Sequence, residues 1–345
     1  MRVRLNSRRL LGWCLALAAL LLVTLVIGVG VGSGSATLLD LWGDQTSGDH
    51  ETKRQILMQV RLPRTLLAAL LGGALSLAGA AFQALLRNPL ADPYVLGVSG
   101  GASIGGVVAL TLVQLPLGLR FIPAPLVVPI FAFLGALAAL FLIERVATVN
   151  GRLTVYTVLL TGAIFNAFSA ALIYFIQSLA SLEELHAIVF HLMGRVREIE
   201  LSWIGLLAIA IAVPSLWLFA SARDFNALST GEEGATQLGV DTERLKRRTF
   251  ILGALLTGIA VSMAGLIGFV GLVVPHLLRL LIGPDHRLLL PASFLGGASF
   301  LVIADTLART LTAPNELPVG VITALVGGPF FLVLLRRRGG QNGFS

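Results

Sequence analysis

The sequence is a succession of long apolar runs separated by short polar turns or turns rich in glycine and proline. A bilayer core about 30 Å thick is crossed by roughly 20 apolar residues in a helix. Runs of this kind cover residues 10–31, 61–86, 94–115, 123–146, 154–179, 201–220, 249–267, 269–282, 288–308 and 317–335. We therefore expect an all-α integral membrane protein with about ten transmembrane helices, forming a single transmembrane domain over residues 1–345. The run at 269–282 is short, so we expect an incomplete or tilted span there.

The composition excludes several functional classes. Only 12% of the residues are charged and 56% are hydrophobic, which leaves no room for a large soluble domain. The lysines are Lys53 and Lys246, and neither lies in the G-x-x-x-x-G-K-[ST] pattern that cradles phosphates. We therefore expect a protein that is not an enzyme, with any ATP hydrolysed on a partner chain. The single cysteine, Cys14, excludes an internal disulfide, and no Cys/His cluster has metal-binding spacing, so no metal and no cofactor are expected.

The first apolar run has two interpretations. Arg2, Arg4, Arg8 and Arg9 precede it, as basic residues precede the hydrophobic core of a secretory signal. The run is longer than the core of about 7–15 residues that such signals have. Its length instead suits a span that stays in the mature protein.

The positions of the basic residues predict the orientation. With the N-terminus inside, 17 of the 25 Lys and Arg residues fall on the cytoplasmic side, as the positive-inside rule requires. An even number of spans returns the C-terminus to the cytoplasm. The net charge of +7 thus reflects topology, and no nucleic-acid partner is expected. The basic residues left outside are Lys53, Arg54, Arg61, Arg64, Arg120, Arg195, Arg197 and Arg309.

Three of these outer residues stand at helix ends. Arg61 and Arg64 lie one helical turn apart at the outer end of the second run, and Arg309 lies at the outer end of the ninth. One interpretation is that they extend to membrane lipid headgroups or pair with a nearby acid such as Glu316. The other is that they dock carboxylates of an external protein, because a guanidinium binds carboxylate in a bidentate manner and stays charged.

Residues 88–103 interrupt the helical pattern. Asn88-Pro89 and Asp92-Pro93 break the helix, and a run of small residues follows from Gly97. Irregular backbone at membrane depth is tolerated only where protein or a water-filled cavity surrounds it. The segment therefore predicts either close helix packing through small residues or a kink that lines a pore near the inner mouth.

Two further functions are open from the residues alone. The string GVSG at 97–100 matches the G-x-S-G of rhomboid-type intramembrane serine proteases, with Ser99 as nucleophile and His276 as base. An ion-coupled secondary transporter would need an ionisable residue inside a span, for which Asp305 is the candidate. Asp305 lies four residues before Arg309 on one helical face, which favours a structural pair over an ion site.

The longest polar stretch, residues 221–248, predicts a cytoplasmic loop. Within it, residues 231–239 are spaced like a short helix, with Glu232 and Glu233 in the first turn, where the helix dipole favours acids. The segment is either a solvated loop or a short helix that docks into a cytosolic partner.

Five strings carry a resemblance to a known family. They are RLPR at 61–64, QALLRNPLADP at 83–93 followed by LGVSGG at 96–101, GFVGLVVPH at 268–276, DHR at 285–287 and ELPVG at 316–320. In this order, over residues 55–337, the chain resembles the FecCD-type permeases. These are the membrane subunits of ABC importers for iron-siderophores, haem and cobalamin. The N-terminal run is similar to the family only in character.

The resemblance implies a type II ABC importer permease architecture in the cell inner membrane. Such a subunit pairs with a second permease subunit, a copy of itself or a close paralogue, around a translocation path. Two cytosolic ATP-binding subunits dock inside, and a periplasmic or lipid-anchored substrate-binding protein docks outside. The implied function is import of a metal chelate into the cytoplasm, with an iron chelate as the first expectation.

The resemblance also implies roles for residues that match the family strings. The residues implied in docking the binding protein are Arg61, Arg64 and Arg309. The residues implied in a cytoplasmic gate are Asn88 and Leu90, with a second gate segment at Thr154, Val155 and Tyr156. The residues implied in ATPase coupling are Gly231, Glu232, Glu233, Gly234, Ala235, Thr236, Gln237, Leu238 and Gly239.

Overall fold

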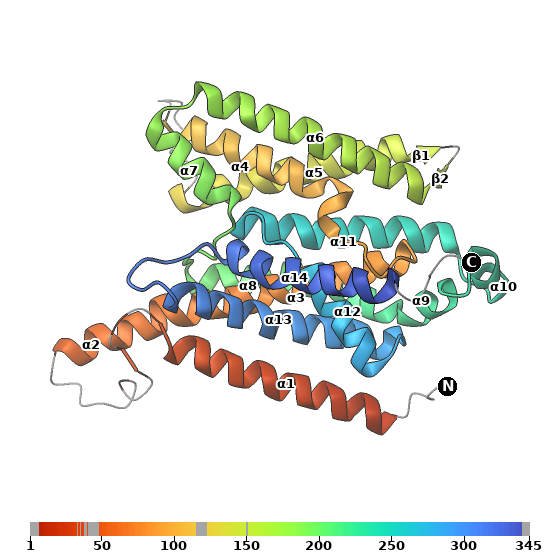
Figure 1. The fold of residues 1–345 in the computed structure, drawn as a ribbon, viewed down its shortest axis with the longest axis horizontal. Helices are drawn as coiled ribbons and strands as arrows, with labels where there is room; N and C mark the ends of the chain where they lie inside the picture. Colours follow the sequence, from red (N-terminus) through yellow and green to blue (C-terminus); the bar gives the residue numbers. More distant parts are fainter. Residues whose placement is uncertain are drawn as a thin grey trace.

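The computed structural model describes residues 7–32, 34, 36, 37, 40, 48–114, 123–149 and 151–339, and most of them are helical (Figure 1). The first half contains α1 (Ser7–Gly30), α2 (Gly48–Gln55), a π-helical turn (Ile56–Arg61), α3 (Leu62–Leu85), a 3₁₀ turn (Pro93–Leu96), α4 (Val98–Gln114), α5 (Ala124–Ala147), the paired strands β1 (Thr148–Val149) and β2 (Arg152–Leu153), and α6 (Val155–Leu179). The second half contains α7 (Leu182–Leu192), α8 (Leu201–Ala220), α9 (Ala222–Leu228), α10 (Glu232–Gln237), α11 (Thr242–Ala264), α12 (Val270–Ile282), α13 (His286–Thr310) and α14 (Val319–Gly339). The predicted all-α class is confirmed.

Each predicted apolar run coincides with a helix. Among the described residues, seven helices are long and apolar enough to cross a membrane: α1, the joined α2 and α3, α5, α6, α8, α11 and α13. Three shorter apolar helices, α4, α12 and α14, account for the other runs. The predicted short span is α12, which has 13 residues.

The helices are arranged around α3. Figure 1 shows α4, α5 and α6 in one layer, with α3, α8, α11, α12, α13 and α14 beside it and α1 on the far side of α13. The apolar window of α3 is 89% buried, whereas that of α1 is only 11% buried. The core therefore lies along α3, and α1 presents most of its apolar surface to the surrounding lipid.

Glycines allow α3 to approach its neighbours closely. A Cβ atom on Gly72 would lie 2.6 Å from the Leu301 Cβ atom and would collide with the Gly297 carbonyl of α13. A Cβ on Gly79 would collide with the backbone of Gly271 in α12. Small residues at such contacts are the usual basis of tight helix packing in membranes.

The connection after α1 differs from the prediction. We expected the second transmembrane helix to begin at Arg61, where the second apolar run begins. Instead, helical backbone begins at Gly48 and runs through the π-helical turn into α3. Pro63 explains the turn, because a proline has no N–H to donate to the carbonyl four residues earlier, and a local change of helical pitch accommodates the loss. Residues 33, 35, 38, 39 and 41–47 of this connection, as well as Arg120, lie outside the described residues.

Helix α7 was not predicted, because the residues between the apolar runs 154–179 and 201–220 were expected to form a short turn. It begins with a capping box: the Ser181 hydroxyl accepts from the Glu184 N–H, and the Glu184 carboxylate accepts from the Ser181 N–H. The S-x-x-E spacing at 181–184 is a recognised helix-start signal and would have predicted the helix.

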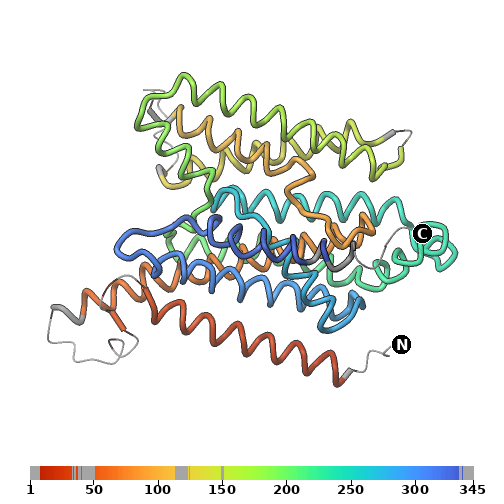
Figure 2. The backbone as a smooth tube through the Cα atoms, in the orientation of Figure 1, coloured from red at the N-terminus to blue at the C-terminus, as the bar shows by residue number. Residues whose placement is uncertain are grey.

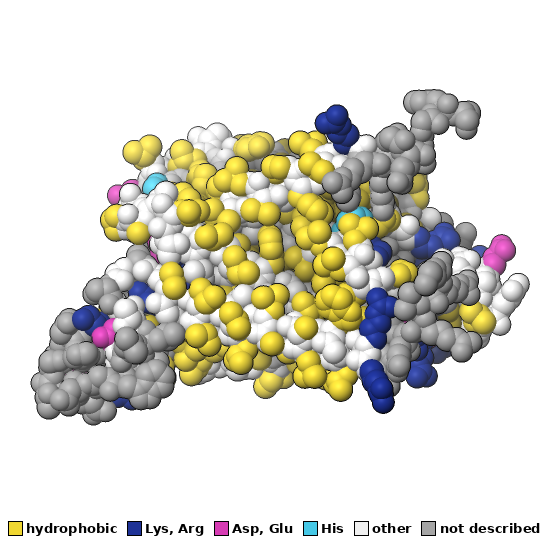
Figure 3. Space-filling model, turned by 60° about the horizontal axis from the view of Figure 1, so that its bottom comes forward, with side chains coloured by type: hydrophobic (Ala, Val, Ile, Leu, Met, Phe, Trp, Pro, Cys, Tyr) yellow, Lys and Arg dark blue, Asp and Glu magenta, His cyan; other side chains and the backbone are white. Residues whose placement is uncertain are grey.

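The two ends of the bundle carry different elements. Helices α2 and α7 lie at one end, while the start of α1, the β1–β2 hairpin, α9, α10 and the end of α14 lie at the other (Figure 2). We call these the α7 end and the α10 end. Figure 3 shows hydrophobic side chains across the middle of one face, with Lys and Arg gathered toward the ends and most of them at the α10 end. This distribution matches a bundle that spans a bilayer with its more basic end inside.

Candidate functional sites

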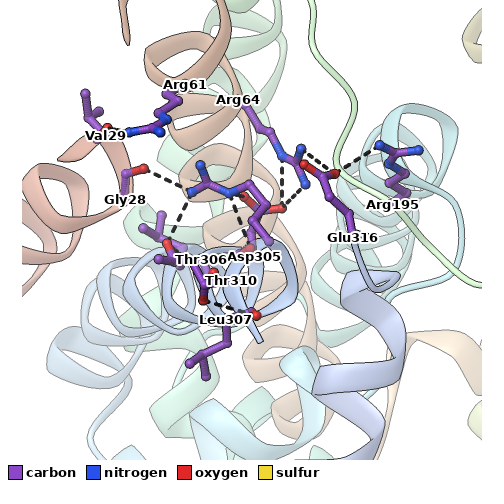
Figure 4. A network of polar contacts seen from close by, with 12 residues as sticks. Gly28, Val29, Arg61, Arg64, Arg195, Asp305, Thr306, Leu307, Thr310 and Glu316 are labelled. Carbon is purple, nitrogen blue, oxygen red and sulfur yellow. Dashed lines mark hydrogen bonds and ion pairs between the residues drawn. The ribbon is translucent and has the colours of Figure 1, made fainter. Parts of the chain in front are cut away.

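Four charged side chains form an ion network at the α7 end (Figure 4). The Arg64 guanidinium contacts the Asp305 carboxylate at 3.0 Å and the Glu316 carboxylate at 2.9 Å. Arg309 contacts the other oxygen of Asp305 at 3.0 Å. We call Arg64, Asp305, Arg309 and Glu316 the outer ion network. It joins α3, α13 and the turn before α14.

The i,i+4 pair of Asp305 and Arg309 was predicted and is confirmed. Asp305 is 1% exposed and lies between two guanidinium groups. A carboxylate held by two arginines is already neutralised, so the geometry favours a structural pair over a site for a coupling ion.

Arg61 lies apart from these carboxylates. Its Nη1 atom donates to the carbonyl oxygen of Gly30, the last residue of α1, at 3.3 Å. It also donates to the carbonyl oxygen of Ala36, which lies after α1, at 2.9 Å. Its Nη2 atom is buried and has no hydrogen-bond partner among the described residues. Arg61 therefore ties the second span to the end of the first, with one donor unsatisfied.

These contacts bear on the docking expectation. Arg61, Arg64 and Arg309 are each 3% exposed, so none of them reaches out to lipid headgroups. The first interpretation also included pairing with Glu316, and Arg64 makes that ion pair. A docked protein reaches these guanidinium groups only by displacing contacts within the subunit. Docking through them stays a prediction.

Glu316 extends the network toward the surface. Its carboxylate also contacts Arg195, which is 48% exposed, at 3.0 Å. Burial opposes ionisation of Glu316, but the hydrogen bond from Arg64 and the charges of Arg64 and Arg195 outweigh it and lower the pKa of Glu316. Glu316 is thus ionised at neutral pH and connects the buried arginines to the 193–200 connection.

The first gate segment is a turn. The Asn88 side-chain oxygen accepts a hydrogen bond from the Leu90 N–H at 3.0 Å, and Arg87 before it has a positive φ of 48°. Asn88 is exposed and Leu90 is half-buried. This hydrogen bond engages the side-chain oxygen of Asn88 within the turn. The gate role of Asn88 stays a prediction.

Sequence reasoning missed Tyr94, which organises the break between α3 and α4. Its hydroxyl accepts from the Ile267 N–H at 2.9 Å, and its carbonyl accepts from the Asn166 amide at 2.8 Å. The Ser99 hydroxyl donates to the same carbonyl at 3.3 Å. Tyr94 therefore joins the break to α6 and to the segment before α12. Ser99 donates to the backbone here, which gives no support to its assignment as a protease nucleophile.

The second gate segment begins α6. Thr154 precedes the helix, and its N–H donates to the Ala147 carbonyl at 3.3 Å across the β1–β2 hairpin. Val155 is half-buried and Tyr156 is 72% exposed. The segment lies at the α10 end, and Tyr156 faces away from the rest of the subunit.

The short helix in residues 231–239 is present as α10. It follows Gly231, whose φ is 109°, and Gly239 after it has a φ of 84°, so glycine suits both boundaries. Ala235 is buried against the protein, whereas Leu238 is 69% exposed. Helix α10 thus offers an exposed apolar side chain at the α10 end of the bundle.

Side chains of α11 connect α10 to the β1–β2 hairpin, which precedes the second gate segment. Lys246 contacts Glu232 of α10 at 3.0 Å and Glu243 at 2.5 Å. The Glu243 carboxylate accepts from the Leu153 N–H of β2 at 3.1 Å. Sequence reasoning had missed Lys246 and Glu243 as connecting residues, although Lys246 is one of only two lysines.

A second set of hydrogen bonds joins α9 to the start of α13. The Asn226 side-chain amide donates to Asp285 at 2.8 Å, and its oxygen accepts from the His286 N–H at 2.9 Å. The hydrogen bond from Arg287 and the one from Asn226 hold the pKa of Asp285 at about 2, against partial burial. The α10 end is therefore connected to the core at two separate points.

Comparisons with known proteins agree with this arrangement. The sequence model of the FecCD transport family matches residues 20–337. The hemin transport system permease HmuU of Yersinia pestis is 40% identical over 345 residues, covering 99% of this chain and all of its own length. The cobalamin import permease BtuC of Halobacterium salinarum is 44% identical over 84% of this chain and 76% of its own.

A solved structure shares the fold. It comes from a protein described as a metal-chelate type ABC transporter in an inward-facing conformation. The TM-score is 0.82 at 30% sequence identity, and the match covers 94% of this chain and 98% of the other. The two relatives are named for different cargoes, hemin and cobalamin, so the family alone leaves the cargo open.

Proposed function

The chain belongs to the FecCD transport family, and from this premise we propose that it is the permease subunit of an ATP-driven importer that moves a metal chelate into the cytoplasm. Iron-siderophore, haem and cobalamin are the cargo classes, with an iron chelate first. The relatives named for hemin and cobalamin support this range.

One observation carries the proposal: α10 is linked through Lys246 and Glu243 to the hairpin that leads into the second gate segment. A displacement of α10 can therefore be transmitted through these contacts to the hairpin and to Thr154 and Tyr156, which follow it. A transport cycle needs a partner that contacts the two conformations differently, and α10 is the surface through which an ATPase supplies that difference.

The difference between the two ends of the bundle supports the following assignment of partners. Two cytosolic ATP-binding subunits dock at the α10 end through residues 231–239, and a substrate-binding protein docks at the α7 end. A second permease subunit covers an exposed apolar face, for which α6, with Phe168 and Phe175 exposed, is suited. The inner membrane surrounds the remaining apolar surface, with both termini on the cytoplasmic side.

We assign the sites accordingly. Arg61, Arg64 and Arg309 receive carboxylates of the binding protein once docking displaces their internal contacts. Asn88 and Leu90, with Thr154 to Tyr156, close the path at the cytoplasmic mouth.

The test is uptake into proteoliposomes that contain the complete complex with its ATPase and binding protein. We expect uptake of an iron chelate only when ATP is present on the side of the α10 end, and none with a hydrolysis-deficient ATPase. Uptake by the permease alone, driven by a proton gradient, would instead establish a secondary transporter.

A further inference from the structure

A cavity of about 480 Å³ lies at the α7 end. Its wall is built from separate segments: α3 supplies Arg64, α7 supplies His186, Phe190 and His191, and the connection after α7 supplies Arg195 and Arg197. A volume of a few hundred Å³, roughly 300–1,000 Å³, is typical of small-molecule sites. The cavity is thus large enough for a chelate, and it is open on one side, where His186, Phe190, Arg195 and Arg197 are exposed.

The charges of the wall are unbalanced. Three arginines line the cavity, against one carboxylate, that of Glu198. Arg64 is paired with Asp305 and Glu316, and Arg195 is paired with Glu316, all outside the lining. Arg197 is exposed and has no ion pair within the described part of the chain, so the unbalanced charge lies on Arg197. Partial burial and then the neighbouring charge of Arg195 lower the pKa of Arg197. A negative group bound between Arg195 and Arg197 would relieve this repulsion.

Another part of the wall is aromatic and uncharged. The rings of His186 and Phe190 lie with their centroids 4.6 Å apart. His191 is 6% exposed and packs so closely on Gly106 of α4 that a Cβ atom there would collide with its ring. Burial, and then the charge of Arg197, lower the pKa of His191 to about 4, so the imidazole is neutral at physiological pH. The wall therefore offers flat contact surface beside the cations.

We propose that this cavity is a receiving site for the cargo and that it selects metal chelates that carry carboxylates. The proposal rests on the proposed import function and names the substrate class. Guanidinium groups pair with carboxylates through two hydrogen bonds, and the aromatic wall suits the organic part of a chelate. The cavity extends from the exposed Arg195 and Arg197 down to Arg64, which is 3% exposed, so a small molecule can enter below the rim.

The test is direct binding to the purified subunit in nanodiscs, without ATP or partners. The probes are hemin and ferric citrate, which carry carboxylates, and hemin dimethyl ester and cyanocobalamin as uncharged counterparts. We expect the anionic probes to bind the unmodified subunit. We expect Arg197→Gln to weaken that binding about tenfold, since a hydrogen-bonded charge is lost, and to leave the dimethyl ester unaffected. Arg54→Gln, an exposed residue of α2 outside the cavity, makes the same charge change and should alter nothing.

Three outcomes would overturn the proposal. One is that neither anionic probe binds the unmodified subunit, and another is that cyanocobalamin binds as tightly as hemin. The third is that Arg197→Gln weakens docking of the binding protein but leaves hemin and ferric citrate unchanged, which would make the cavity a docking site. None of these results measures ATP-driven uptake, so the import function is tested independently by the proteoliposome assay.

Discussion

Glu243 joins two segments that lie 90 residues apart, because its carboxylate accepts a hydrogen bond from the Leu153 N–H at 3.1 Å. The same carboxylate contacts Lys246, which also holds Glu232 of α10. Glu243 and Lys246 therefore connect the β1–β2 hairpin, and the segment Thr154–Tyr156 after it, to α10.

Glu243→Gln should weaken this connection, because an amide oxygen is a poorer acceptor than a carboxylate and removes the charge that pairs with Lys246. We expect reduced chelate uptake in the reconstituted complex while the ATPase subunits stay bound and continue to hydrolyse ATP. Glu51→Gln, at an exposed position of α2, is the control. Uptake at the unmodified level in Glu243→Gln would show that the connection does not transmit motion.

Thr236→Pro should break α10. A proline inside a helix costs about 3 kcal/mol relative to alanine, and Thr236 is exposed, so the spans keep their packing. The expected result is a membrane-inserted subunit that no longer co-purifies with its ATPase. Thr236→Ala keeps the N–H and should keep the helix. Equal co-purification of both variants would argue against coupling through α10.

Asp305→Ala should destabilise the subunit strongly. It leaves Arg64 and Arg309, each 3% exposed, without their shared carboxylate, and breaking a buried ion pair costs about 3–5 kcal/mol. Thermal unfolding in detergent measures the loss. Replacing Arg64, Asp305 and Arg309 together with leucine should cost less than Asp305→Ala alone, because no unpaired buried charge remains within the trio. A larger loss in the triple variant would contradict the role assigned to the network.

Glu316 should make the stability of the α7 end depend on pH. Its pKa is lowered from the ordinary value of 4.5 in the folded protein, so its ion pairs contribute fully above that value. The contribution is lost as the pH falls below 4.5 and through the folded pKa. The melting temperature of Glu316→Gln should therefore differ from the unmodified protein at pH 7 and converge with it in acid. A constant difference across that range would refute the assignment.

The apolar runs predicted the spans because a membrane helix must satisfy its own backbone and present apolar side chains, and both constraints are local. The Asp305–Arg309 pair was predictable for the same reason, since i,i+4 spacing places the two on one face. Helix α10 was one of two alternatives for residues 231–239, indicated by the helical spacing of the segment and its acidic first turn.

Contacts between distant segments were not predictable in the same way. Arg64 and Asp305 are 241 residues apart, and no local pattern indicates that α3 and α13 bring them together. The burial of Arg61 likewise depends on carbonyl groups at the end of α1. The start of α7 is different, because the Ser181–Glu184 capping box was readable in the sequence.

Photo-crosslinking in intact membranes tests the central claim most directly, because it reports which partner lies at which end. A photoreactive residue at Leu238, which is 69% exposed next to α10, should crosslink to the ATPase subunit. The same residue at Leu311, which is 62% exposed at the α7 end, should not. An ATPase crosslink at Leu311, or none at Leu238 in an assembled complex, would contradict an ATP-driven permease whose α10 end faces the cytoplasm.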